Sequence, residues 1–365
     1  MSEDKELKQW KEKLFYQPKN GYDRIDAEQA GEIFAYAEGY KQFLNAARTE
    51  REAVKEAIRM AEAEGFVPYT FGMELQPGSK VYVNNRGKAL MLAVLGQQPL
   101  DHGCVIAGAH IDSPRLDLKQ TPMYEDSELA YFKTHYYGGI KKYQWTCIPL
   151  ALIGVVYTKD GRKVEINIGL KDSDPVFYIS DLLIHMAQDQ MKKSLAEGIT
   201  GEQLQPIIAT NSDENQKPKE ALMKMFKDTY GIEEEDFAAA ELELVPAEKS
   251  RDVGFDRSLI ASYGQDDRVC SYANLEAILD AKPGVKTQAA LLTDKEEIGS
   301  YGNTGMESSY FVKFVMKLLS LQGQNTILDF YETMENSEML SADVNSCLDP
   351  MFPEVSEKDN ASFLG

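Results

Sequence analysis

The stretch Thr293-Asp-Lys-Glu-Glu-Ile-Gly-Ser300 stands directly after the short apolar run 289–292. An aliphatic run of that length, closed by charged residues and then by glycine, predicts a buried strand that ends in a loop. Open α/β sheets place their chemistry at such strand ends. Glu296 and Glu297 would repel each other unless a cation or a shared proton relieved them. We therefore expect one carboxylate to bind metal and the other to handle protons.

The composition excludes several classes of partner. With 365 residues, 43% of them hydrophobic, the chain is long enough for two domains and a sizeable core. Its net charge of −20 disfavours nucleic acid and anionic lipid surfaces, since both carry the same sign of charge. We expect neither nucleic acid nor a membrane as a partner.

Localisation is predicted from the opening residues and the cysteines. The first eight residues have no apolar signal core, and no stretch approaches the length that a bilayer requires. The four cysteines are far apart and form no Cys-x-x-Cys pair, which fits reduced thiols and argues against a cysteine-rich zinc site. These features predict a cytoplasmic protein whose metal site, if it has one, is built mainly from carboxylates.

Acidic or imidazole side chains recur at or near the ends of predicted strands. His110 and Asp112 follow the apolar run 104–109, Asp343 follows another short apolar run, and the pair 266–267 precedes an amphipathic helix. Each is weak evidence alone, because such residues also serve as ordinary turns, helix caps or dipole partners. Because parallel strands bring their carboxyl ends to one edge, however, these side chains can meet there.

This pattern suits a hydrolase with two cations. Such a site calls for a shared carboxylate, terminal His and Asp/Glu ligands, and a base for the attacking water. His110 suits a terminal nitrogen ligand, and Asp112 could orient its imidazole. The mixed nitrogen and oxygen donor set favours zinc, with cobalt or manganese as substitutes.

The order of strands and helices predicts two domains. Strands are expected at 80–84, 89–94 and 104–109, after two amphipathic helices. From about 124 the chain becomes rich in tyrosine and β-branched residues, and the earlier strand and helix pattern resumes after about 250. We therefore predict one domain from 1–118 and 251–365, interrupted by a smaller β-rich domain at 119–250.

Four motifs carry a resemblance to a known family. The segments are His110-Ile-Asp-Ser-Pro-Arg-Leu-Asp-Leu-Lys119, Gly264-Gln-Asp-Asp-Arg268, Asp294-Lys-Glu-Glu-Ile-Gly-Ser300 and Ser341-Ala-Asp343. In this order they resemble the signatures of the aspartyl aminopeptidase and aminopeptidase I family of metallopeptidases. The resemblance implies an α/β fold of the zinc-exopeptidase type, with a central mixed sheet flanked by helices and an inserted smaller β-rich domain used in assembly.

The resemblance also implies a role for each motif residue. Two zinc ions would be bridged by Asp266, with His110 and Asp343 completing one site and Glu297 serving the other. Glu296 would be the general base and Asp112 would steady His110. His185 falls near a histidine that, in this family, reaches a neighbouring subunit, although a histidine packed on a helix face is an equal alternative. We expect Arg115 to form a salt bridge inside the fold.

The sequence departs from the family pattern at its carboxyl-terminal end. The family has a further histidine ligand there, whereas no histidine follows His185 in this chain. The expectation is a C-terminally incomplete catalytic domain whose second metal site lacks that ligand. The main prediction is a zinc-dependent aminopeptidase that acts on peptides as a homo-oligomer. The alternatives are a catalytically incompetent fragment or assembly subunit, and a different co-catalytic metal hydrolase such as a glutamyl-aminopeptidase-like peptidase or a deacylase.

Overall fold

The computed structural model describes residues 10–16, 18–210 and 217–364, so the first eight residues, on which the localisation prediction partly rests, lie outside it. Contacts along the chain divide it into two compact units, 1–40 with 344–365, and 41–343. Among its described residues the smaller unit contains most of helix α2 (Ala27–Ala46) and three short 3₁₀ turns, Gly21–Arg24, Pro353–Val355 and Lys358–Asn360. All predicted site residues belong to the larger unit.

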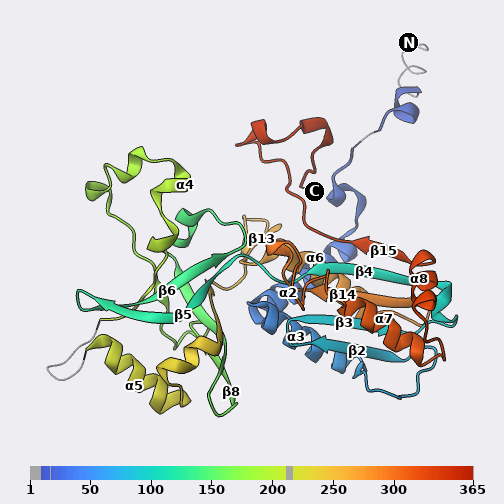
Figure 1. The fold of residues 1–365 in the computed structure, drawn as a ribbon. Coiled ribbons are helices and arrows are strands. Elements are labelled where there is room, and N and C mark those ends of the chain that lie inside the picture. The colour runs from blue at the N-terminus through green and yellow to red at the C-terminus, as the bar shows by residue number, and fades with distance from the viewer. Residues whose placement is uncertain (1–9, 17, 211–216, 365) are drawn as a thin grey trace, which may run out of the picture. The chain divides into compact units, whose positions relative to one another are not determined.

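One of the two large sheets of the larger unit is a mixed sheet of six strands (Figure 1). The strand order is β1-β2-β3-β14-β4-β15, in which β4 runs parallel to both β14 and β15 while β3 runs antiparallel to β14. The strands predicted at 80–84, 89–94 and 104–109 are confirmed. The strands are β1 (Val67–Pro68), β2 (Lys80–Asn85), β3 (Ala89–Val94), β14 (Thr287–Thr293), β4 (Cys104–His110) and β15 (Glu338–Ser341).

Helices cover both faces of this sheet, as predicted. On one face the apolar side of α7, including Phe314 and Leu318, packs with Phe330 of α8 against alternate strand residues such as Val81 and Leu291. On the other face α6 packs against β4 and β14, and α3 packs against β3. The helices are α3 (Glu50–Ala63), α6 (Gln265–Leu279), α7 (Tyr310–Ser320) and α8 (Ile327–Glu335).

Strands β5 to β11 build a second sheet with its own core. Its seven strands run β11-β5-β6-β10-β9-β7-β8, and β11 also pairs with β7, so the sheet curls back on itself. Helix α5 (Pro218–Tyr230) contributes Phe226 to that core, next to Phe132 and Phe237. The strands are β5 (Arg115–Asp126), β6 (Leu129–Tyr137), β7 (Pro149–Tyr157), β8 (Lys163–Ile168), β9 (Phe177–Tyr178), β10 (Ile207–Ala209) and β11 (Ala240–Pro246).

Charged side chains buried between the two sheets pair with one another. The Arg115 guanidinium lies 2.9 Å from Asp117, 3.2 Å from Glu243 and 3.7 Å from Glu50, and the Lys88 ammonium lies 3.1 Å from Glu50. The expected salt bridge of Arg115 is therefore confirmed. Burial opposes ionisation of Glu50, but Arg115 and Lys88 outweigh it and hold the pKa of Glu50 well below its usual value.

Candidate metal centre

His110 is the last residue of β4, and its imidazole is buried beneath a group of carboxylates. The Nε2 atom lies 3.2 Å from Asp266 Oδ1, 3.7 Å from Glu296 Oε2 and 3.9 Å from Asp343 Oδ1. The three carboxylates are about half exposed, whereas the ring is 4% exposed. The site is therefore an open acidic mouth with a nitrogen donor at its base.

These side chains come from a turn after one strand, from the residues after another strand, and from the start of a helix. Glu296 begins a short 3₁₀ turn, Glu296–Ile298, that follows β14, and Asp343 stands two residues after β15. Because β14 and β15 flank β4 in parallel, the three strand ends meet as predicted. Asp266 differs, because it lies in the first turn of α6, whose preceding strand β13 (Leu259–Ala261) belongs to a separate two-stranded sheet with β12 (Arg251–Val253). The idea that parallel strand ends bring the acidic segments together therefore does not hold for Asp266, whereas the helix predicted after the pair 266–267 is confirmed.

Hydrogen bonds hold Asp266 and His110 in place. Ser113 Oγ donates to the carbonyl of Asp266 at 2.7 Å, and Ser271 Oγ donates to the carbonyl of His110 at 2.6 Å. The peptide bond between Asp266 and Asp267 is cis. The carboxylate of Asp267 is fully buried, and burial raises its pKa to about 6. Asp266 rather than Asp267 therefore faces the mouth.

Asp112 orients the histidine from the other side. His110 Nδ1 lies 3.0 Å from the Asp112 carbonyl oxygen and 3.3 Å from its Oδ1. Burial alone would lower the pKa of His110, but the hydrogen bond and charge of Asp112 raise it to about 9. The backbone N–H groups of Glu296 and Glu297 donate to the Asp112 carboxylate at 3.1 and 3.2 Å. Asp112 thus connects the His110 segment to the two glutamates.

The donor set fits a metal ion. One donor atom from each of His110, Asp266 and Asp343 lies within 4.8 Å of the other two. Among the described residues His110 Nε2 is buried and makes no hydrogen bond of acceptable geometry, so its lone pair is available to a metal ion once the ring has lost its proton. One imidazole nitrogen with carboxylate oxygens is a donor set that suits zinc.

Glu297 lies beside this group rather than within it. Burial, and then repulsion by Asp266 and Asp112, raise the pKa of Glu297 to about 7. Its carboxylate lies against Gly138, at the end of β6. Burial contributes most to this shift, and repulsion between the glutamate and Asp266 adds to it.

His185 shows no link to the metal centre. It lies in the exposed 3₁₀ turn Ile184–Met186, and none of the hydrogen bonds or ion pairs described for 10–16, 18–210 and 217–364 joins it to His110 or the carboxylates. The role of His185 stays a prediction.

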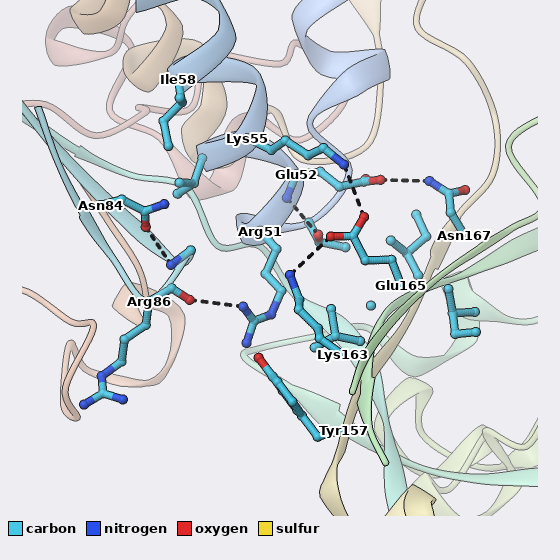
Figure 2. Close-up of a pocket in the computed structure, with 17 residues that line it drawn as sticks. Arg51, Glu52, Lys55, Ile58, Asn84, Arg86, Tyr157, Lys163, Glu165 and Asn167 are labelled. Carbon is cyan, nitrogen blue, oxygen red and sulfur yellow. Dashed lines mark hydrogen bonds and ion pairs between the residues drawn. The ribbon is translucent and has the colours of Figure 1, made fainter. Parts of the chain in front are cut away.

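A cavity of about 760 Å³ lies apart from these residues, between α3 and strands β7 and β8. Figure 2 shows that its charged side chains largely pair across its own walls: Lys55 and Lys163 each lie 3.2 Å from Glu165, and Asn167 donates to Glu52 at 2.8 Å. Since its charges are matched in this way, the cavity offers less to a ligand than the mouth above His110.

The comparison with protein families decides the family of the chain. The model of the family described as aminopeptidase I zinc metalloprotease (M18) matches residues 43–365. The chain belongs to the M18 family. The predicted family and the main functional prediction, a zinc-dependent metallo-aminopeptidase, are thereby confirmed.

Known M18 proteins resemble the chain over most of its length. A probable M18 family aminopeptidase 1 of Clostridium acetobutylicum is 48% identical over 360 residues, which cover 96% of this chain and 77% of that protein. A solved M18 aminopeptidase of Thermotoga maritima has a TM-score of 0.90 at 41% identity, covering 96% of this chain and 77% of the other. Solved aminopeptidase I of C. acetobutylicum has a TM-score of 0.87 at 45% identity, with the same coverage. The predicted zinc-exopeptidase-like α/β fold is confirmed.

Two further observations bear on the M18 chain's setting. None of the described helices combines the length and the apolar composition of a bilayer-spanning segment. All four cysteines are unpaired, and only Cys104 is buried.

Sequence reasoning missed two contributors to this M18 site, Tyr137 and Gly138. The Tyr137 hydroxyl donates to Asp112 Oδ2 at 2.7 Å, and Gly138 contacts Glu297. A signal existed, since two glycines follow a run of aromatic residues here, but only the fold shows which carboxylates they meet.

Proposed function

We propose that this M18 chain removes amino-terminal residues from peptides, with zinc held by His110, Asp266 and Asp343. The observation that carries the proposal is the buried Nε2 of His110 beneath three exposed carboxylates. We further propose that Asp266 and Glu297 would together hold a second ion, since burial and then repulsion by Asp266 raise the pKa of Glu297, and a cation near both carboxylates would relieve the repulsion. Cobalt and manganese accept the same donors and are expected to replace zinc.

The side chains divide the chemistry among them. Zinc, when bound, supplies a Lewis acid that activates water and polarises the scissile carbonyl. Glu296 is the proposed general base: its half-exposed carboxylate lies beside the proposed ligands, 3.7 Å from His110 Nε2, and can take the proton of the attacking water, then pass it to the leaving amine. Asp112 keeps Nδ1 of His110 engaged, so that Nε2 remains the donor.

The charge of the mouth supports cleavage at an amino terminus. Asp266, Asp343 and Glu296 present exposed carboxylates in a chain of net charge −20. The ammonium group of a peptide's first residue complements such a surface, whereas the carboxylate of its last residue would be repelled.

We also propose that 119–250 is an inserted domain that assembles the chain into a homo-oligomer. Exposed apolar side chains on this segment support the proposal, among them Leu183, Ile184 and Met186. His185 lies between two of them and is the proposed contact to a neighbouring subunit's site. A cytoplasmic, reducing setting is consistent with the four unpaired cysteines.

The function is tested with aminoacyl-nitroanilides, assayed with and without a chelator. Chelator-sensitive release of nitroaniline is expected, and Glu296→Gln should abolish it while zinc content stays unchanged. An intact oligomer that binds zinc without turnover would favour an assembly subunit. Turnover of acylated amines alone would favour a deacylase, and an active Glu296→Gln chain would show that the base is assigned wrongly.

A further inference from the structure

The end of strand β6 lies at the metal centre, although β6 belongs to the seven-stranded sheet. Tyr137 is its last residue, pairs with Arg115 of β5 and is buried. Its ring packs under the Arg115 guanidinium, with 3.7 Å between the guanidinium carbon and the ring centroid. Because Arg115 is itself fixed by Asp117, Glu243 and Glu50, the ring has little freedom to move.

We propose that Tyr137 and Gly138 are positioning residues of the metal centre, so that the seven-stranded sheet completes the site as well as serving assembly. The proposal rests on the proposed function, since it concerns the same zinc ligands. The two residues stand at the end of β6 and act through Asp112 and Glu297.

Tyr137 acts through Asp112. Its hydroxyl donates to Oδ2 at 2.7 Å, which leaves Oδ1 turned toward His110 Nδ1 at 3.3 Å. The same carboxylate accepts the N–H groups of Glu296 and Glu297. Without the hydroxyl, one strong donor to Oδ2 is lost and the carboxylate can rotate away from the ring. The orientation of His110 would then be less well fixed before metal binds.

Gly138 acts on Glu297. Its φ is +72°, and a Cβ built there would lie 3.0 Å from Glu297 Oε2 and 3.2 Å from Glu297 Cβ. A side chain at this position would therefore force the glutamate to move by a few tenths of an ångström. The absence of one lets Glu297 lie directly against the backbone at the end of β6.

The hydroxyl is tested by comparing two tyrosines in the full-length chain. Tyr137→Phe keeps the ring on Arg115 and removes only the donor to Asp112. Tyr82→Phe is the matched control, because the Tyr82 hydroxyl also donates to a carboxylate at 2.7 Å, that of Glu62, and that residue pair has no part in the site. Zinc affinity is measured by competition with a chromogenic chelator. Tyr137→Phe should weaken it about 10–100-fold, the usual effect of losing a partner behind a ligand, and Tyr82→Phe should leave it unchanged.

The glycine is tested in the same way. Gly138→Ala is compared with Gly161→Ala, since Gly161 also has a positive φ, +83°, but has no atom within 4 Å of the added Cβ. Both substitutions strain the backbone equally, so a loss of zinc affinity in Gly138→Ala alone supports the proposal. Equal zinc affinities in the two variants would contradict it.

The outcomes separate this inference from the proposed function. If the wild-type chain binds zinc and Tyr137→Phe binds it equally well, the inference is wrong and the function stands. If the wild-type chain takes no zinc, the proposed function fails, and a crystal structure of the metal-free Tyr137→Phe chain still tests the positioning. Asp112 and His110 should shift in that structure but not in Tyr82→Phe, and unshifted side chains would contradict the inference.

Discussion

His110 Nε2 lies 3.2 Å from Oδ1 of Asp266, although one residue ends a central strand and the other begins a helix on the face of the same sheet. Helix α6 packs on β4, which carries Asp266 over the strand end. An imidazole at the base of an acidic mouth follows from this packing, and the metal chemistry depends on it.

We predict that His110→Asn lowers zinc affinity by more than about 100-fold. Losing a residue that only orients a ligand costs up to about 100-fold, and this substitution removes the nitrogen donor itself. His102→Asn is the control, since His102 is exposed in a different part of the chain. Equilibrium competition with a chelator measures both. Similar affinities for the two variants would rule out His110 as a ligand.

Zinc binding should depend on pH through His110. In the metal-free chain burial lowers its pKa, but Asp112 prevails and raises the pKa to about 9. Below that pH a proton occupies the ring and competes with the metal, so zinc affinity should rise about tenfold per pH unit from 7 to 9 and level off above. Competition titrations across this range measure the slope. A flat profile would contradict the assigned ligand.

The sequence predicted the strand ends well, because their signals are local. The apolar runs before His110 and Glu296 are short, end in polar residues and form buried strands, whereas the run before Asp343 forms the exposed edge strand β15. Asp266 did not fit that rule, since its place depends on how α6 packs. Tyr137 could not be found, because its meeting with Asp112 depends on the register of β5 with β6 and on how that pair lies against β4. The boundaries at 119 and 250 stay a prediction.

Arg115→Met should destabilise the fold strongly. The substitution leaves Glu243 and Glu50 buried with fewer cations, and breaking such a pair typically costs about 3–5 kcal/mol. Arg59→Ala is the control, because Arg59 pairs with Glu56 at the surface and its loss should cost less than about 1 kcal/mol. Urea unfolding of both variants gives the free energies of unfolding. Equal losses of unfolding free energy in the two variants would show that the buried charge pairs stabilise the fold no more than the surface pair does.

The most direct test of the metal centre is anomalous X-ray scattering at the zinc absorption edge, from crystals of the zinc-loaded chain. We predict a strong peak bounded by His110 Nε2 and the carboxylates of Asp266 and Asp343, with a second peak between Asp266 and Glu297. Zinc found only elsewhere on the chain, with these side chains free of it, would contradict the assignment.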